Sequence, residues 1–514
     1  MAVKQNGINH TGKNLKITVV ALLVLIVAGT LVRSYNIDGS LFGFHKYRQF
    51  DTAAVARNFY EGDMNIFYPQ VDWRGNSLGY AETEFQIYTY LVAALYHVFG
   101  PYEWVGRALN ILFYSLSAVI LFCFSRRLFD DTVALLSVFF YSFVPLTIYF
   151  NRSFQPDTLI ALCSFAGIYL FWNWTERDRR LYLLLSAVSI SIAVLIKPPS
   201  LYVGLPILYL CYRKFKWNCF RNVELWIFAA IIFLPALLWY RHSLHLWEEH
   251  GNTFGILGVH TLLGYWPLSD PKWLSLFKHL SMRLLFEIAT PAGLIFLVVG
   301  FFRKNPRRNE LMLWWTVAFV IYIFLVPVGH RGHDYYQLPI VFVTSSYMAY
   351  GVKILLDNKK LPRVIIIALC LGVMIFGVWK FNAMMSMEEQ DFNQLAFGKQ
   401  VNRLTEEDAR IIFIAPRPHS RYIPELYRHR TAEGERLYVD PVDFYLSHRK
   451  GWSLDEVQAT PEFVETLRQR GAQYVATSYP EIFTRQRELK AALDSRYTLI
   501  DINSGWAIYQ MNIK

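Results

Sequence analysis

The chain has 514 residues, of which 54% are hydrophobic and only 18% are charged. Because about 25% of the residues in an ordinary soluble domain are charged, this composition excludes a typical soluble enzyme and predicts a polytopic membrane protein. The net charge of +11 does not imply a nucleic-acid partner, since the basic residues form short clusters between apolar segments, as orientation in a membrane requires. The five cysteines lie in apolar runs or a basic connector, so we expect neither a disulfide framework nor a cysteine metal site.

The first apolar run, residues 17–34, follows Lys4, Lys13 and Lys16 and has no obvious small-residue cleavage site after it. It predicts a retained membrane span with a cytoplasmic N-terminus. The next run, residues 85–99, is shorter than the roughly 20 residues that a spanning helix needs. We therefore expect it to lie along the outer surface of the membrane.

Between these two runs, the polar stretch 44–61 predicts a surface helix that starts near Arg48. Arg48 and Asp51 are three residues apart and share one edge of that helix. A cation beside a carboxylate suits a site that holds a phosphate with one group and takes a proton with the other. The alternative is an interfacial amphipathic helix with a solvated salt bridge and no chemical role.

Ten further runs of spanning or near-spanning length follow, which makes eleven predicted transmembrane helices with the first. An odd number places the chain ends on opposite sides of the membrane, and every connector on the predicted inner side is basic, as the orientation rule requires. Two short helices are expected to meet at the proline break Lys197-Pro198-Pro199. The ten runs are 104–124, 132–150, 157–174, 181–196, 199–212, 223–240, 283–302, 311–328, 335–356 and 363–381.

After residue 381 the chain becomes polar enough to be soluble. Strand-like runs (411–415, 474–477, 499–502, 506–511) and helical runs (462–470, 481–495) follow one another, which predicts a small α/β domain. The expected organisation is a transmembrane domain, residues 1–381 with an outer loop at 35–103, and an extracytoplasmic domain, residues 382–514. No Gly-rich phosphate loop and no fixed repeat is evident.

Ionisable and aromatic residues recur in the connectors on the predicted outer side. A single charged residue at the end of a span often reaches water without any further role, but their repeated placement on one side favours a site there. Besides Arg48 and Asp51, these candidates are Glu82, Glu84, Arg107, Asp157, Lys197, His333, Tyr335 and Tyr336.

The order of these motifs resembles the C-type (GT-C) membrane glycosyltransferases, most closely families 39 and 83, the protein O-mannosyltransferases and lipid A aminoarabinose transferases. The likeness covers residues 15–380 and ends in His333-x-Tyr335-Tyr336-x-x-Pro339. It implies the GT-C fold in a bacterial inner membrane and a sugar donor linked to polyprenyl phosphate. The acceptor implied is a lipid, a glycan or a protein on the outer side, and the anomeric centre is inverted.

By this resemblance Asp51 is the general base, with Glu84 and Asp157 beside it at the catalytic centre. Arg107, Lys197 and Arg48 bind the donor phosphate, and Glu82, His333, Tyr335 and Tyr336 shape the sugar and acceptor site. The chemistry agrees with these roles, because a phosphate leaving group needs cations rather than a general acid. No cofactor is assigned, although a divalent cation held by Asp51, Glu84 and Asp157 is an alternative that the spacing leaves open.

Two departures from the family pattern limit what it implies about the acceptor. Thr52 follows Asp51 where the family usually has a second acidic residue, and Glu82-Thr83-Glu84-Phe85 stands where the aminoarabinose transferases carry Lys-Pro-Pro. A lipid A acceptor is therefore not implied. The alternative functions are a lipid-linked glycan ligase or polymerase with a diphosphate-linked donor, and a transporter. A transporter is disfavoured because no repeated halves and no mid-membrane ionisable residues are evident.

Overall fold

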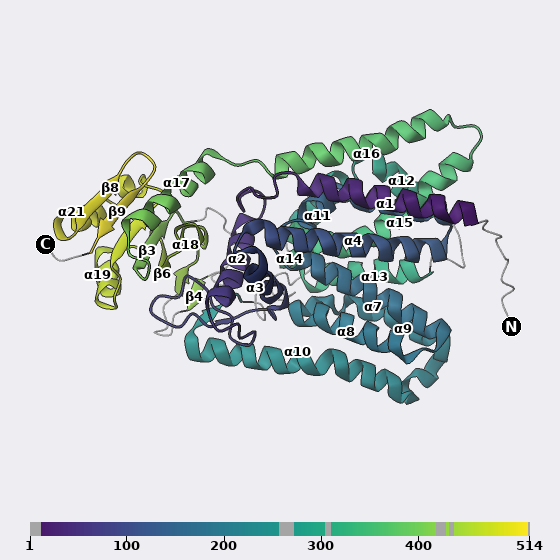
Figure 1. Cartoon of the computed structure of the whole chain (residues 1–514), viewed down its shortest axis with the longest axis horizontal. Helices are drawn as coiled ribbons and strands as arrows, with labels where there is room; N and C mark the ends of the chain where they lie inside the picture. The colour runs from purple at the N-terminus through teal and green to yellow at the C-terminus, as the bar shows by residue number, and fades with distance from the viewer. Residues whose placement is uncertain (1–11, 256–271, 304–309, 418–427, 431–435, 512–514) are drawn as a thin grey trace.

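The computed structural model describes residues 12–255, 272–303, 310–417, 428–430 and 436–511. The molecule is elongated, with a bundle of long helices at one end and an α/β domain at the other (Figure 1). The surface helices α2 (Lys46–Glu61) and α3 (Ile87–Phe99) lie between them. Of the basic residues whose positions predict the orientation, Lys4, Lys304, Arg307 and Arg308 lie outside the described residues.

Among the described residues, six helical segments are long and apolar enough to cross a membrane. A seventh candidate is bent by 101° and joins α11 (Lys272–Arg283) and the π-turn η4 (Leu284–Ile288) to α12 (Pro291–Phe302). Shorter apolar helices are α3, α5 (Asp131–Phe143), α8 (Arg180–Ile196) and α13 (Glu310–Leu325). The six contain α1 (Gly12–Ser34), α4 (Glu103–Leu128), α7 (Asp157–Arg177), α10 (Val223–His250), α15 (Leu338–Asp357) and α16 (Arg363–Met384).

Each of the eleven predicted runs coincides with helix, but several are shorter or broken, so the number of spans is approximate. The run 132–150 divides at Pro145 into α5 and α6 (Pro145–Phe150), because proline lacks the N–H that a continuous helix needs. The run 199–212 consists of the 3-10 turn η1 (Pro198–Val203) followed by α9 (Gly204–Phe215). Helix α10 (Val223–His250) continues beyond the predicted run 223–240, and α11 begins at Lys272, before the predicted run 283–302. Residues 256–271 lie outside the described residues.

Glycines allow α12 and α15 to approach closely in the bundle. A Cβ atom at Gly300 would lie 1.9 Å from the carbonyl oxygen of Tyr347, and one at Gly351 would lie 2.0 Å from that of Phe296. Small residues commonly permit such backbone contact between membrane helices. This packing joins α12 to the second half of α15, the helix whose first residues line the pocket described below.

The α/β domain follows α17 (Glu389–Leu404) and is built on a five-stranded sheet in the order β6-β3-β7-β9-β8. β3 (Arg410–Ala415) runs parallel to β6 (Lys450–Asp455) and β7 (Tyr474–Thr477). β9 (Ala507–Gln510) runs antiparallel to β7 and to β8 (Thr498–Ile502). The four predicted strands are confirmed, whereas β6, which reads Lys-Gly-Trp-Ser-Leu-Asp, was not predicted. The remaining elements are α18 (Val442–Ser447), α19 (Pro461–Gln469), α20 (Ile482–Arg485), α21 (Arg487–Arg496) and the hairpin β4 (Arg428–Arg430) with β5 (Arg436–Tyr438).

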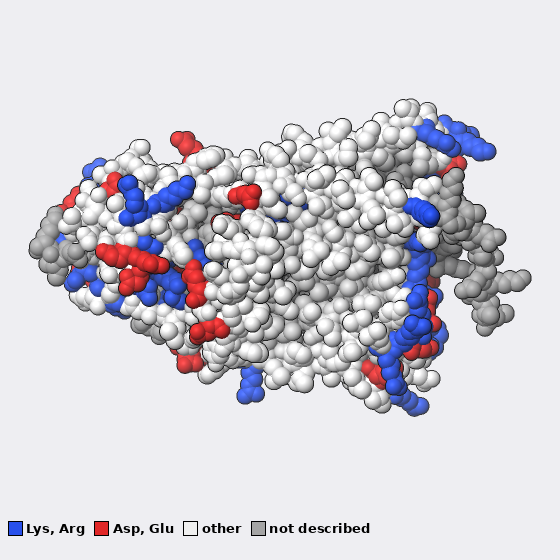
Figure 2. Space-filling view, in the orientation of Figure 1, with Lys and Arg blue, Asp and Glu red and all other residues white. Residues whose placement is uncertain are grey.

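Charged side chains gather at the two ends of the molecule and leave a broad uncharged belt over the bundle (Figure 2). Lys and Arg concentrate at the end of the bundle away from the α/β domain. Arg126 and Arg127 in the last turn of α4, and Arg213 and Lys214 in the last turn of α9, are among the basic residues of the predicted inner connectors. This distribution is typical of a protein embedded in a bilayer.

Candidate functional site

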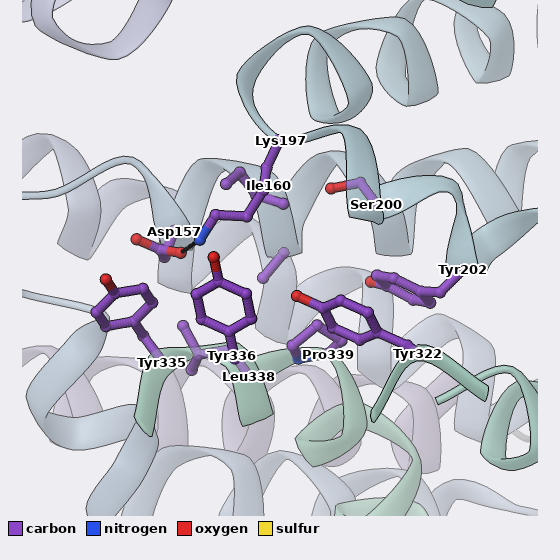
Figure 3. A pocket seen from close by; sticks show the side chains of 11 residues that line it. Asp157, Ile160, Lys197, Ser200, Tyr202, Tyr322, Tyr335, Tyr336, Leu338 and Pro339 are labelled. Atoms are coloured by element: carbon purple, nitrogen blue, oxygen red, sulfur yellow. Dashed lines mark hydrogen bonds and ion pairs between the residues drawn. The ribbon is translucent and has the colours of Figure 1, made fainter. Parts of the chain in front are cut away.

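A pocket lies where the start of α7, the break after α8, α13 and the start of α15 meet (Figure 3). It contains about 290 Å³ of empty space, including some that is open to solvent. Four of the sequence candidates line this pocket, and they come from three segments far apart in the chain: Asp157, Lys197, and Tyr335 with Tyr336. The lining residues are Asp157, Ile160, Ala161, Lys197, Ser200, Tyr202, Tyr322, Tyr335, Tyr336, Leu338 and Pro339.

Lys197 is the cation of this pocket. It is the residue before Pro198 and has an extended backbone, as a following proline favours, so α8 ends there and the side chain turns into the pocket. Its Nζ donates to Oδ1 of Asp157 at 2.8 Å and lies 4.1 Å from the ring centroid of Tyr336. The other oxygen of Asp157, Oδ2, is buried and has no hydrogen-bond partner among the described residues.

Arg48 and Asp51 lie on α2 and are not among the residues that line this pocket. Arg48 forms an ion pair with Glu84 and acts electrostatically on Lys197 and Tyr336. The carboxylate of Asp51 accepts a hydrogen bond from Nε1 of Trp73 at 2.9 Å. Burial raises the pKa of Asp51 to about 7, although the Trp73 hydrogen bond and the Arg48 charge act in the opposite direction. The predicted edge therefore combines a cation with a carboxyl group that titrates near neutral pH.

A second polar network joins the start of α2 to the turn η5 (Asp334–Gln337). Nε2 of His45 contacts Oδ2 of Asp334 at 2.9 Å, and Arg283 forms an ion pair with the same carboxylate. The ring of His333 stacks on Tyr335, with 5.1 Å between centroids, and lies 5.6 Å from that of His45. This network fixes the position of the start of α2 relative to the tyrosines of η5.

Two sequence candidates have other contacts. Arg107 is buried on α4, and its guanidinium donates to the carbonyl oxygens of Ile37, Gly39 and Ser40, in the loop before α2. Glu82 accepts from the Thr253 hydroxyl and from the Gly255 backbone N–H. Neither residue lines the pocket.

Sequence reasoning missed Trp73, His45, Arg283 and Tyr322. Each is a single residue in a loop or on a helix, without neighbours that form a motif, so only its contacts reveal it. Among the residues that the structure describes, no group of three His, Cys, Asp or Glu side chains is placed to hold a metal ion. The cation site considered for Asp51, Glu84 and Asp157 is therefore not assembled.

The apolar bundle, its two surface helices and its pocket beside an α/β domain define a polytopic membrane protein with the GT-C fold. The structure is similar to that of ArnT from Cupriavidus metallidurans in the apo state, with a TM-score of 0.62, 12% identity and coverage of 96% of this chain and 98% of that one. ArnT bound to undecaprenyl phosphate gives a TM-score of 0.60 at 11% identity, with the same coverage of both chains.

Other solved structures share the fold. The Archaeoglobus fulgidus oligosaccharyltransferase in complex with Zn and sulfate has a TM-score of 0.55 at 12% identity, with 95% of this chain and 73% of that chain covered. The arabinofuranosyltransferase AftD from Mycobacteria has a TM-score of 0.53 at 11% identity, with 96% and 41% covered. A sequence model described as dolichyl-phosphate-mannose-protein mannosyltransferase matches residues 87–239. No protein with a curated description matches the sequence.

Proposed function

We propose that this protein is a glycosyltransferase that moves a sugar from a polyprenyl-phosphate carrier to an acceptor hydroxyl, with inversion at the anomeric carbon. The observation that carries the proposal is the placement of Asp51, whose pKa is raised to about 7, on the same helix edge as Arg48, which acts on Lys197 in the pocket. The GT-C fold supports it, as does the similarity to ArnT, which has been solved with bound undecaprenyl phosphate.

In the proposed reaction, Asp51 takes the proton of the acceptor hydroxyl as that oxygen attacks the anomeric carbon. The bond between this carbon and the phosphate oxygen breaks, and polyprenyl phosphate leaves with the bonding electrons. A base with a pKa near the working pH is effective because enough of it is ionised and it still binds a proton well. Lys197 and Arg48 bind the phosphate, whose charge they match.

Asp157 and Glu84 orient these two cations, because each carboxylate is paired with one of them. Tyr335 and Tyr336 supply the aromatic wall of the sugar site, and His333 supports them through ring stacking. Arg107 and Glu82 act at a distance, by holding the loop before α2 and the segment around β2 (Asn252–Thr253).

The proposed location is a bacterial inner membrane, with the N-terminus in the cytoplasm and the α/β domain outside. The concentration of Lys and Arg at the end of the bundle away from that domain (Figure 2) supports this orientation. The pocket and α2 then lie at the outer surface, where lipid-linked sugars and their acceptors meet.

The test is to incubate the protein in nanodiscs with undecaprenyl-phosphate-linked hexoses and pentoses and a cell-envelope extract, and to measure release of undecaprenyl phosphate. We expect release with at least one donor by the wild type and its loss in Asp51→Asn. Release from diphosphate-linked glycans alone would instead support the ligase or polymerase. If neither donor class gives acceptor-dependent release, both the glycosyltransferase and the ligase or polymerase are overturned.

A further inference from the structure

Trp73 is a buried residue in the loop between α2 and β1 (Ala81–Glu82), and its indole points at the proposed base. Nε1 of Trp73 donates to Oδ1 of Asp51 at 2.9 Å. An indole N–H can donate a hydrogen bond but cannot accept one, so this contact favours the ionised carboxylate over the protonated acid. It also fixes the position of one carboxylate oxygen of Asp51.

The loop that carries Trp73 is attached to the α/β domain through backbone hydrogen bonds. The N–H of Gly75 donates to the carbonyl of Gly451 at 2.7 Å, and the N–H of Gly451 donates to the carbonyl of Asp72 at 3.2 Å. Gly75 has a positive φ of 54°, and a Cβ atom there would lie 2.6 Å from Nε1 of Trp452. The loop thus packs on β6, one of the two edge strands of the sheet.

The same loop is attached to α2 on its other side. The carboxylate of Asp72 accepts from Arg57 and from Asn58, each at 2.8 Å. The loop that carries Trp73 is therefore held by hydrogen bonds on both sides, to α2, which bears Asp51, and to the α/β domain. Its ring packs edge-on against Phe254, with 5.5 Å between the centroids.

We propose that the α/β domain positions the base of the reaction: β6 fixes the loop 72–75, and Trp73 on that loop orients Asp51 and favours its ionised form. This inference rests on the proposed function, because it assigns Asp51 the task of accepting a proton. Trp73 is a positioning residue, since it acts on the acceptor only through Asp51. The α/β domain is then part of the catalytic apparatus whichever acceptor is used.

Three charged groups, Arg48, Asp72 and Asp440, act electrostatically on Asp51 besides the indole. Arg48 on the same helix favours the ionised form, whereas Asp72 on the loop and Asp440 in the α/β domain disfavour it, as does burial. Trp73 and Arg48 thus both oppose the rise in the pKa of Asp51 that burial causes. A hydrogen bond to a charged group corresponds to about one to two pKa units, so Trp73→Phe is expected to raise the pKa of Asp51 by about one unit or more.

The experiment is an infrared titration of the carboxyl C=O band of Asp51 in nanodiscs without substrate, with the Asp51→Asn spectrum subtracted. If the pKa rises from about 7 to about 8, the ionised fraction at pH 7 falls from about half to about one tenth. The matched control is Trp506→Phe, which removes another indole–carboxylate hydrogen bond of 2.9 Å, that to Asp501, and should leave the Asp51 band unchanged. If the pKa of Asp51 is the same in Trp73→Phe as in the wild type, the inference is overturned.

Gly75→Ala tests the role of the α/β domain in positioning Asp51, because this variant keeps the indole of Trp73 but displaces the loop from Trp452. We expect the pKa of Asp51 to rise in this variant too, and an unchanged titration would show that the domain does not position the base. Should Trp73→Phe fail to fold, wild-type protein with ¹⁵N-labelled tryptophan provides the measurement. One of its 15 indole signals should shift with pH near 7 and lose that shift in Asp51→Asn; no such signal would overturn the inference.

The two proposals can fail separately. If Asp51→Asn releases undecaprenyl phosphate as fast as wild type, the proposed function loses its base whatever the infrared spectra show. If Asp51→Asn is inactive and Trp73→Phe leaves the Asp51 titration unchanged, only the positioning role of Trp73 is overturned.

Discussion

Lys197 and Asp157 are 40 residues apart in the sequence, yet Nζ of the first donates to Oδ1 of the second at 2.8 Å inside the pocket. A buried ion pair is weak evidence of stabilisation, because desolvation of the two charges offsets their attraction. Oδ2 of Asp157 also remains unpartnered among the described residues. We therefore interpret the pair as a cation held ready for an anionic ligand.

Lys197→Gln tests this interpretation through binding of undecaprenyl phosphate in nanodiscs. Loss of a charge-assisted contact in a partly dehydrated site, worth about 1.5 to 3 kcal/mol, should weaken binding about ten- to a hundredfold. The control is Lys353→Gln, which also breaks a lysine–aspartate pair, that with Asp357 at 2.9 Å, but lies in the last turns of α15. Equal affinity of wild type and Lys197→Gln would remove Lys197 from the donor site.

Asp51→Asn is expected to lower turnover by about a hundredfold or more, the usual range for loss of a general base. Binding of undecaprenyl phosphate should change little, because the cations remain. In the wild type, turnover should fall as the pH drops below about 7, where Asp51 becomes protonated. A flat pH–rate profile between pH 5 and pH 8 would contradict the role of Asp51.

The raised pKa of Asp51 also makes stability depend on pH, in the direction opposite to turnover. Between its ordinary pKa of 3.8 and its folded value of about 7, Asp51 binds more protons in the folded state than in the unfolded state. The free energy of unfolding therefore falls as the pH rises through this window. We expect Asp51→Asn to raise the melting temperature at pH 8 and to have little effect at pH 4, as measured by thermal unfolding in detergent. Equal melting temperatures of wild type and variant at pH 8 would contradict the burial of this charge.

Arg107→Gln separates a structural role from phosphate binding. Because the guanidinium holds the carbonyls of Ile37, Gly39 and Ser40, its loss should destabilise the protein by about 2 kcal/mol. The control Arg180→Gln removes a highly exposed arginine and should cost about 0.5 kcal/mol or less. Weakened binding of undecaprenyl phosphate at an unchanged melting temperature would instead support the role in phosphate binding that the family resemblance implies.

The orientation is tested by labelling intact cells with a membrane-impermeant thiol reagent. A cysteine at the exposed Ser495 of the α/β domain should react, whereas one at the exposed Lys359, after α15, should react only after lysis. The reverse pattern would place the pocket on the cytoplasmic side. The native cysteines provide the background, since they lie in apolar segments or the basic connector.

The sequence by itself determined the class of the protein and the order of its helices. Long apolar runs leave water for the membrane, and basic connectors indicate the side of the membrane on which they remain. The bundle and the surface position of α2 therefore follow from local composition. The alternation of runs after residue 381 likewise determined the α/β domain. Arg48 and Asp51 were predictable as neighbours because helix geometry alone places residues three apart on one edge.

Only the tertiary structure decided which of the candidates share a site. The pairing of Lys197 with Asp157, and of Arg48 with Glu84, depends on how helices pack, which no local pattern records. Arg107 and Lys197 are both cations at helix ends, yet one is bound by backbone carbonyls while the other faces a pocket. The contact between Trp73 and Asp51 depends on β6, a strand without a sequence signal, because the loop that orients the indole is held by hydrogen bonds to Gly451.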